Sequence, residues 1–316
     1  MARVLVTRHL PHGGTDPLVA AGHDIVARDD DTPFSASELR DAVRDVDAVV
    51  CLLTDRIDAE VIGAGSPRLR VVANVAVGYD NIDVAAARSA GVAVCNTPGV
   101  LDETTADLAF FLILSASRLA SEAEADLRGG RWAGWGITQY LGRDVHGATL
   151  GLVGHGHIGQ AVARRAAGFG MPVLHHTRTD TGLPGWHADL DEMLSASDVV
   201  SLHVPLSDST RHLIDARRIA LLRTDAVLVN TARGPIVDEE ALAVALESGR
   251  LFAAGLDVYE REPDVHARLL AAPRTVLLPH IGSASIATRT QMARLACEGA
   301  VAVLAGEHPA NLVART

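Results

Sequence analysis

Short apolar runs rich in β-branched residues alternate with alanine-rich stretches along most of the chain, and this alternation restricts the possible folds most. The expected strands form two series, residues 4–7, 25–27, 48–53, 71–74 and 92–96, then residues 149–153, 172–175, 199–203, 226–230, 253–257 and 275–278. Because the runs are apolar throughout, they are typical of parallel strands covered by helices on both faces. The sequence therefore predicts an α/β fold class with parallel sheets.

Two long helices suggest how the chain of 316 residues divides, and this length favours two domains or one large one. One helix is expected over residues 104–127, before Gly129-Gly130, and leads into a loop rich in glycine and tryptophan. The other is expected over residues 285–304. We infer a first domain of residues 1–98, a second of residues 99–285, and a final segment, residues 286–316, that returns to the first domain.

Composition excludes several classes of function. All 28 basic residues are arginine, which excludes Schiff-base, P-loop and general-base chemistry at lysine. The net charge of −11 argues against a nucleic-acid partner or an anionic membrane surface. The three cysteines and fourteen histidines show neither a disulfide framework nor metal-ligand spacing. The longest apolar run, residues 108–114, is too short to span a bilayer and no signal peptide is evident, so we expect a cytoplasmic protein without a metal.

Residues 150–159 read Leu-Gly-Leu-Val-Gly-His-Gly-His-Ile-Gly and contain the spacing GxGxxG between an expected strand and an expected helix. This context distinguishes a dinucleotide-binding loop from an ordinary glycine-rich turn. The first glycine allows a tight turn, the second admits the pyrophosphate to the backbone, and the third lets the helix pack against the strand. The expected phosphate contacts, at the helix N-terminus, are Gly154, His155, Gly156, His157, Ile158 and Gly159.

The end of the next expected strand indicates which dinucleotide binds. An acidic residue there would bind the ribose 2′-hydroxyl of NAD, but the strand ends His175-His176-Thr177-Arg178-Thr179. Arg178 offers a fork for a 2′-phosphate, and the two threonines offer hydroxyl groups. The sequence therefore favours NADP(H), with NAD(H) possible. The alternative, that Asp180 binds the ribose and Arg178 is a solvated surface residue, stays open.

Three later strand ends carry polar residues that suit the reduction of a small oxo acid. Arg233 offers a fork for a carboxylate and a carbonyl oxygen, and His280 offers a proton near neutral pH. A carboxylate bonded to the second imidazole nitrogen would fix the tautomer of His280. Glu262 is the candidate, and spacing alone does not exclude Glu260. Because ligands bind at the carboxyl ends of parallel strands, we expect these side chains to lie together.

These segments resemble the D-isomer-specific 2-hydroxyacid dehydrogenases, most of all their glyoxylate/hydroxypyruvate reductase branch. The similarity covers nearly the whole chain. Its segments are Leu52-Leu53-Thr54-Asp55, Val77-Gly78-Tyr79-Asp80-Asn81-Ile82-Asp83, Asn96-Thr97-Pro98, Thr105-Ala106-Asp107-Leu108-Ala109, the glycine loop, and the Arg233, Glu262 and His280 segments. Their number and order make the resemblance far more specific than any single motif.

The resemblance implies two Rossmann-like, doubly wound domains with the active site in the cleft between them, and a homodimer. It implies reduction of glyoxylate or hydroxypyruvate with NAD(P)H, with His280 as acid/base, Arg233 on the substrate and Glu262, rather than Glu260, paired with His280. The further cofactor contacts that it implies are Thr105, Thr231, Ala232, Asp257 and Gly282. The substrate contacts that it implies are Leu53, Val77, Gly78, Arg233 and His280.

Two alternatives remain open at this point. The same scaffold would also suit D-3-phosphoglycerate or D-lactate dehydrogenase activity, and fold alone would allow a non-catalytic protein that senses a dinucleotide. Two departures from the family pattern are the histidines on either side of Gly156 and the absence of a proline after Trp135. We expect Trp132 to pack its loop, and the sequence leaves the role of Trp135 undecided.

Overall fold

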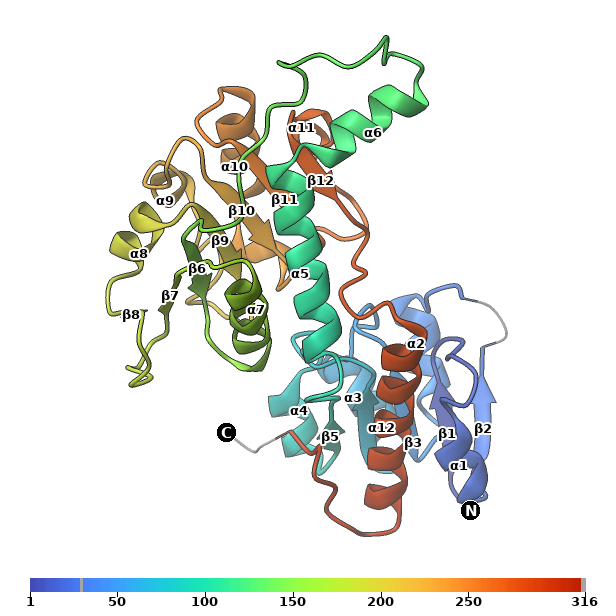
Figure 1. Cartoon of the computed structure of the whole chain (residues 1–316). Coiled ribbons are helices and arrows are strands. Elements are labelled where there is room, and N and C mark those ends of the chain that lie inside the picture. The colour runs from blue at the N-terminus through green and yellow to red at the C-terminus, as the bar shows by residue number, and fades with distance from the viewer. Residues whose placement is uncertain (29–30, 314–316) are drawn as a thin grey trace. The chain divides into compact units, whose positions relative to one another are not determined.

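The computed structural model describes residues 1–28 and 31–313, so the last three residues of the predicted segment 286–316 lie outside the described part. The chain forms two compact units. Unit 1 comprises Met1–Leu101 and the segment from Ser283 onward, and unit 2 comprises Asp102–Gly282. Each unit contains its own parallel sheet with helices (Figure 1), which confirms the predicted α/β fold class. The substrate-binding role expected of residues 1–98 and 286–316 and the dinucleotide-binding role expected of residues 99–285 stay predictions.

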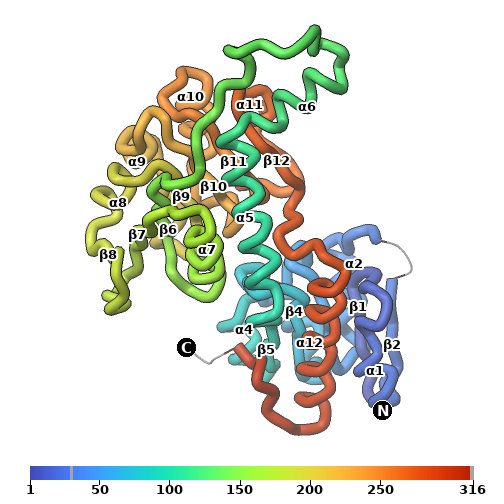
Figure 2. The backbone as a smooth tube through the Cα atoms, viewed as in Figure 1, coloured from blue at the N-terminus to red at the C-terminus, as the bar shows by residue number. Residues whose placement is uncertain are grey.

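Unit 1 contains a five-stranded parallel sheet in the order β2-β1-β3-β4-β5. Its elements are β1 (Arg3–Val6), α1 (Asp16–Ala20), β2 (Asp24–Ala27), α2 (Ala36–Ala42), β3 (Ala48–Cys51), α3 (Ala59–Gly65), β4 (Val71–Asn74), α4 (Val84–Ser89), β5 (Ala93–Cys95) and α12 (Ile286–Leu304). Every residue of β3 and β4 is buried, as expected of strands covered on both faces. The long helix α12 comes from the far end of the chain and packs along β3, β4 and β5 (Figure 2).

Unit 2 contains a seven-stranded parallel sheet in the order β12-β11-β10-β9-β6-β7-β8. Its elements are α5 (Asp102–Ser117), α6 (Ala120–Arg128), β6 (Leu150–Val153), α7 (His157–Gly168), β7 (Val173–His176), β8 (Trp186–His187), α8 (Leu190–Ala196), β9 (Val199–Leu202), α9 (Ala216–Ile219), β10 (Val227–Asn230), the 3-10 helix η1 (Gly234–Ile236), α10 (Glu239–Glu247), β11 (Ala253–Leu256), α11 (Ala267–Ala271) and β12 (Thr275–Leu277). The strand order reverses between β6 and β9, which is where dinucleotides bind in open sheets of this kind.

The prediction of one continuous helix over residues 104–127 is wrong. Residues 104–127 form two helices, α5 and α6, because Leu119 adopts a left-handed backbone conformation with φ of 52°. The last carbonyl of α5, that of Ser117, accepts a hydrogen bond from Arg143 N–H at 2.7 Å instead of continuing the helix. A long-range contact therefore ends α5, and the local sequence gives no sign of it. The expected strands are all present, whereas the short strand β8 was not predicted.

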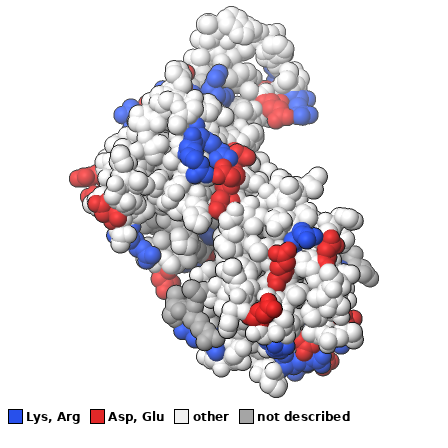
Figure 3. Space-filling model, turned by 60° about the horizontal axis from the view of Figure 1, so that its bottom comes forward, with Lys and Arg blue, Asp and Glu red and all other residues white. Residues whose placement is uncertain are grey.

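Charged side chains of both signs lie beside one another on the molecular surface. On the face drawn in Figure 3, basic and acidic residues are adjacent and most of the surface carries neither. In unit 2, for example, Arg165 bonds Asp107 and Glu103 across helices α7 and α5. Among residues 1–28 and 31–313, no helix is long and apolar enough to cross a membrane, and no cluster of His, Cys, Asp or Glu suits a metal ion.

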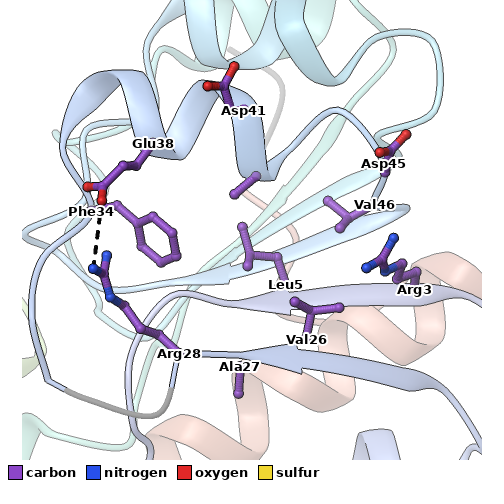
Figure 4. Close-up of a pocket in the computed structure, with 11 residues that line it drawn as sticks. Arg3, Leu5, Val26, Ala27, Arg28, Phe34, Glu38, Asp41, Asp45 and Val46 are labelled. Carbon is purple, nitrogen blue, oxygen red and sulfur yellow. Dashed lines mark ion pairs between the residues drawn. The ribbon is translucent and has the colours of Figure 1, made fainter.

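Unit 1 also contains a cavity of about 400 Å³ between α2 and the first two strands of its sheet (Figure 4). Apolar side chains, among them Leu5 and Phe34, line it, and an ion pair between Arg28 and Glu38, 3.8 Å apart, stands at one side. The cavity runs along the face of the sheet, and no predicted site residue lines it.

Candidate active site

The predicted site residues of unit 2, except Thr105, follow the carboxyl ends of strands in one sheet. The glycine loop follows β6, residues 177–179 follow β7, and residues 231–233 follow β10. Asp257 follows β11, and residues 280–282 follow β12. Since every strand pair in this sheet is parallel, these segments share one edge. Thr105 reaches the same edge from α5, where a Cβ built on Gly282 would lie 3.6 Å from the Thr105 hydroxyl oxygen.

The glycine loop has the geometry that a pyrophosphate requires. Gly154 has a φ of 96°, and a Cβ there would lie 2.5 Å from the carbonyl oxygen of His203. A Cβ on Gly159 would lie 2.4 Å from the carbonyl oxygen of Gly154, so helix and turn are in direct contact. A Cβ on Gly156 would meet no described atom within 4 Å, and α7 begins at the next residue. The open position before a helix N-terminus fits a dinucleotide phosphate.

The two loop histidines differ in their surroundings. His155 stacks on His175 with ring centroids 4.1 Å apart, and burial lowers the pKa of both imidazoles. Its Nδ1 is buried and has no hydrogen-bond partner among the described residues. The side chain of His157 is 78% exposed, with Nδ1 3.4 Å from Asp102 Oδ2. His157 is therefore the more solvent-accessible of the two rings.

The strand end after β7 presents an exposed arginine, and the nearest acid takes part in a turn beyond it. Thr177 donates its hydroxyl to the carbonyl of Thr179 at 2.7 Å and accepts from Trp186 Nε1 at 3.2 Å. Arg178 is exposed and makes no ion pair with any residue that the structure describes. Asp180 lies four residues beyond the strand and accepts a hydrogen bond from Gly182 N–H at 2.8 Å, which closes a turn.

His280 and Glu262 form the central pair of this edge. His280 Nδ1 donates to Glu262 Oε2 at 2.8 Å, and Glu262 Oε1 accepts from Tyr259 N–H at 2.9 Å. Burial raises the pKa of Glu262, but the hydrogen bond and charge of His280, the Tyr259 N–H and the charge of Arg233 together lower it below its usual value. Glu262 is therefore ionised near neutral pH and fixes the ring so that Nε2 is the nitrogen left for a substrate.

The His280 backbone is held in an unusual conformation by a buried acid. His280 has a φ of 56°, a left-handed conformation that non-glycine residues rarely adopt. Asp257 is fully buried, accepts from Ile281 N–H at 2.7 Å and Gly282 N–H at 2.8 Å, and its carbonyl accepts from His280 N–H at 2.9 Å. Burial raises the pKa of Asp257, against the effect of those N–H groups and of His280. These three bonds maintain the strained residue.

Arg233 is positioned by the strand end before it and by the Glu262 loop. Asn230, buried at the end of β10, accepts from Ala232 N–H at 3.0 Å and donates to the carbonyl of Arg233 at 2.9 Å. A Cβ on Gly234 would overlap the carbonyl carbon of Tyr259 at 1.8 Å, so the two loops pack backbone against backbone. The Thr231 hydroxyl is buried without a partner among the described residues and is available to a ligand.

The structure also separates Glu262 from its competitor. Glu260 accepts from Glu239 N–H at 3.0 Å and lies 3.1 Å from His212 Nε2. Glu239 in turn accepts from Glu260 N–H at 2.7 Å. Glu260 therefore anchors the start of α10, whereas Glu262 alone of the two bonds His280.

Comparison with known proteins identifies the family. The family model described as "D-isomer specific 2-hydroxyacid dehydrogenase, NAD binding domain" matches residues 110–282. A glyoxylate reductase of Thermococcus onnurineus is 45% identical over 322 residues, which cover 99% of this chain and 96% of that protein. The chain belongs to the D-isomer-specific 2-hydroxyacid dehydrogenase family. The resemblance that its motifs indicated is thereby confirmed.

Solved structures of other family members share the whole fold. A glyoxylate reductase from Paecilomyes thermophila is 36% identical with a TM-score of 0.86, and the match covers 98% of each chain. An NADPH-dependent glyoxylate/hydroxypyruvate reductase from Sinorhizobium meliloti, in complex with NADP and malonate, is 36% identical with a TM-score of 0.87 over 99% of this chain and 96% of that one. Membership of this dehydrogenase family makes the chain an NAD(P)-dependent oxidoreductase.

Sequence reasoning missed the residues that hold the dehydrogenase site in place. Asn230 carries the Arg233 loop, and Tyr259 donates its hydroxyl to the carbonyl of Leu278 at 3.0 Å, which ties the Glu262 loop to the end of β12. A polar residue ending an apolar strand was a usable signal for Asn230. No comparable signal marked Tyr259. Trp132 was expected to pack its loop, but it is 51% exposed, and Trp135 is 80% exposed.

Proposed function

We propose that the protein reduces a small 2-oxo acid, glyoxylate or hydroxypyruvate, to the D-2-hydroxy acid with NADPH. The observation that carries this proposal is the His280–Glu262 hydrogen bond of 2.8 Å, in a loop system packed directly against the Arg233 loop. A proton donor, the acid that orients it and a cation for a carboxylate are the groups that carbonyl reduction of a small acid needs. The curated relatives named glyoxylate reductase support the choice of substrate.

In this proposal, each residue at the carboxyl edge of the unit 2 sheet has its own role in the reaction. When bound, the dinucleotide would supply a hydride for the carbonyl carbon of the substrate. Arg233 binds the carboxylate and the carbonyl oxygen, and protonated His280 donates from Nε2 to that oxygen as negative charge develops there. Ionised Glu262 keeps the Nδ1–H of the ring in place and stabilises its positive charge. In the same proposal, Leu53, Val77 and Gly78 of unit 1 contact the acid.

The dinucleotide contacts follow from the loop geometry. We propose that the N–H groups of residues 154–159 and the start of α7 bind the pyrophosphate, with His157 close by. Thr105, Thr231, Ala232, Asp257 and Gly282 stay as predicted contacts near the nicotinamide and its ribose. Arg178 and Thr179 bind the 2′-phosphate, since Arg178 is exposed and the nearest acid, Asp180, lies four residues beyond β7 with one oxygen in a turn. Thr177 stays a predicted contact, which would exchange its bond to the Thr179 carbonyl for one to the phosphate. This arrangement supports NADP(H) as the preferred cofactor.

We also propose a homodimer. Five large apolar side chains are exposed on α6 and the loop after it, more than an isolated surface loop usually carries: Leu127, Trp132, Trp135, Ile137 and Leu141. A second copy of the chain would bury them. Replacement of Ile137 and Leu141 together by aspartate should convert a dimer to a monomer in light scattering. An unchanged mass for the double variant would contradict this contact.

A cytoplasmic location is the remaining part of the proposal. Cys51, Cys95 and Cys297 are free, buried thiols, as is usual for proteins of a reducing compartment. Fractionation of cells that produce the protein would test this, and recovery outside the cytoplasm would contradict it.

A matrix of initial rates tests the activity. NADPH and NADH are each combined with glyoxylate, hydroxypyruvate, pyruvate and phosphohydroxypyruvate, and oxidation is followed at about 340 nm, where the reduced nicotinamide absorbs. The proposal expects the highest kcat/KM for NADPH with glyoxylate or hydroxypyruvate. A clear preference for pyruvate or for the phosphorylated acid would favour the lactate or phosphoglycerate alternatives. Binding of NADPH without turnover of any acid would favour a non-catalytic role.

A further inference from the structure

The backbone after β4 in unit 1 has three successive carbonyl groups that each accept a hydrogen bond from another part of the unit. The carbonyl oxygen of residue 76 accepts from Thr97 N–H at 2.9 Å. The next, that of residue 77, accepts from the side-chain amide of Asn96 at 2.8 Å, and that of residue 78 accepts from the side-chain amide of Asn74 at 2.8 Å. Both asparagines stand at the carboxyl ends of strands, Asn74 as the last residue of β4 and Asn96 directly after β5.

Holding these carbonyls determines where the neighbouring N–H groups point. In a trans peptide the C=O and the N–H point in opposite directions, so the N–H groups of Val77, Gly78 and Tyr79 point away from the donors that hold the carbonyls. None of these three N–H groups donates to an acceptor within residues 1–28 and 31–313. Val77 and Gly78 are partly exposed, and Tyr79 is exposed. Accessible N–H groups without a partner among the described residues are available to donate to an anion.

We propose that Asn74 and Asn96 are positioning residues that set the affinity for the substrate carboxylate by directing the N–H groups of residues 77–79 outward. The inference rests on the proposed function, in which Val77 and Gly78 contact a 2-oxo acid. The three main-chain N–H groups bind the carboxylate, and the two amide side chains hold those N–H groups in position. The negatively charged protein thereby binds a carboxylate in unit 1 without a cationic side chain at this point.

A third amide extends the same network to the loop after β3. Asn81 donates from Nδ2 to the carbonyl of Leu52 at 3.1 Å and to that of Asp55 at 3.0 Å, while its Oδ1 accepts from Asn74 at 3.1 Å. Asn74 is fully buried and so has no alternative water partner. The segment with the predicted substrate residue Leu53 and the N–H groups of residues 77–79 are therefore aligned by one set of amides.

The role requires a donor, which explains amides rather than acids at these positions. A carboxylate at position 96 cannot donate to the carbonyl of Val77 and repels it when ionised. A protonated carboxyl group can donate. The KM of Asn96→Asp for the acid substrate, divided by that of the wild type, should therefore be high at neutral pH and fall as the pH is lowered. Taking the ratio removes the pH dependence that both proteins share through His280.

The test compares Asn96→Ala with a matched control, Asn311→Ala. Asn311 also donates an amide hydrogen, at 2.9 Å, but to the main-chain carbonyl of Asn96. We expect Asn96→Ala to raise the KM for glyoxylate and the inhibition constant of oxalate about tenfold. Without the Asn96–Val77 bond the Gly78 N–H is no longer held in place, and a lost N–H bond to a carboxylate has an effect of about this size. The dissociation constant of NADPH, followed by its fluorescence, should change less than about twofold. Asn311→Ala should lower the Tm and leave the KM for glyoxylate unchanged.

The outcomes separate this inference from the function on which it rests. A wild type that turns over none of the four acids would refute the proposed function. A wild type that reduces glyoxylate, together with an unchanged KM in Asn96→Ala, would overturn the positioning role alone. Equal increases in the KM for glyoxylate in Asn96→Ala and Asn311→Ala would also overturn it, because they would indicate general damage to unit 1. A fall in the KM ratio of Asn96→Asp to wild type at acidic pH would support it whatever the stability of the alanine variants.

Discussion

The carboxyl edge of the unit 1 sheet and the His280 loop of unit 2 are held by opposite kinds of side chain. In unit 1, the amides of Asn74 and Asn96 donate to main-chain carbonyls and leave N–H groups pointing outward. In unit 2, the carboxylate of Asp257 accepts from main-chain N–H groups, and Glu260 does the same at the start of α10. Donor side chains thus align backbone donors in unit 1, whereas an acceptor side chain, Asp257, fixes the loop that presents His280 in unit 2. The Arg233 loop of unit 2 is held by an amide, Asn230, that both accepts and donates.

The difference separates recognition from proton transfer. Backbone N–H groups bind an anion at any pH and cannot exchange a proton usefully, which suits the recognition of a carboxylate. An imidazole bonded to an ionised acid can give up and regain a proton near neutral pH, which suits chemistry. We therefore expect substitutions at the unit 1 edge to act mainly on KM and substitutions at the unit 2 edge to act mainly on kcat.

The largest effect should come from His280→Ala. Removal of a general acid lowers rates by about 10²- to 10⁴-fold, so kcat for glyoxylate should fall about 10³-fold. The affinity for NADPH, measured by fluorescence without an acid substrate, should stay within about twofold of the wild type. Steady-state rates of His280→Ala and Asn96→Ala, measured side by side, then give the contrast directly. A raised KM for glyoxylate in His280→Ala, with kcat unchanged, would contradict the expected difference between the two edges.

Asp257→Asn should have the next largest effect. The amide offers one acceptor oxygen in place of two, so Ile281 N–H or Gly282 N–H loses its partner, which costs about 1–3 kcal/mol of unfolding free energy. Since the same bonds hold His280 in its left-handed conformation, kcat should fall as well, by about tenfold. Urea unfolding and initial rates measure the two effects. Normal kcat despite lower stability would show that Asp257 is structural only.

Much of this architecture was predictable from the sequence because buried parallel strands appear there as short, continuous apolar runs. The run at residues 71–74 was predicted to the residue and is β4. Other predicted strands extend too far at their carboxyl ends: the run at 48–53 ends as β3 at Cys51, and the run at 253–257 ends as β11 at Leu256. Those extra residues belong to the ligand edge. Their positions are determined by long-range contacts, which local periodicity does not report.

The candidate site was predictable only in part, for a related reason. Strand-end spacing pointed to Arg233 and His280, because each is a chemically active residue directly after an apolar run. The choice between Glu260 and Glu262 depended on the resemblance to known dehydrogenases, since both acids follow the same strand. The asparagines that align the backbone look like ordinary strand ends. Their role depends on which carbonyls they bond, and only the folded chain shows that.

Acid pH should destabilise unit 2 through a histidine beneath the glycine loop. Burial, with a smaller effect of His155, lowers the pKa of His203 to about 4, from a usual value of 6.5. Because the folded value is depressed, the stabilisation is fully present above pH 6.5 and is lost as the pH falls from 6.5 toward 4. As the residue is partly accessible, we expect a loss on the order of 2 kcal/mol. Plots of Tm against pH for the wild type and His203→Gln should diverge in that window, and parallel curves would contradict this assignment.

Arg178→Ala should have the smallest effect, and it tests the preference for NADPH over NADH most directly. If unit 2 recognises the 2′-phosphate by a side chain, loss of that charge should raise the KM for NADPH about tenfold and leave the KM for NADH within about twofold. Asp180→Asn is the matched control, because it tests the alternative that this acid binds the ribose hydroxyl. An increase in the KM for NADH in Asp180→Asn, with equal effects on both cofactors in Arg178→Ala, would assign the strand end to NAD. The converse result would show that unit 2 recognises its anion with a side chain where unit 1 uses its backbone.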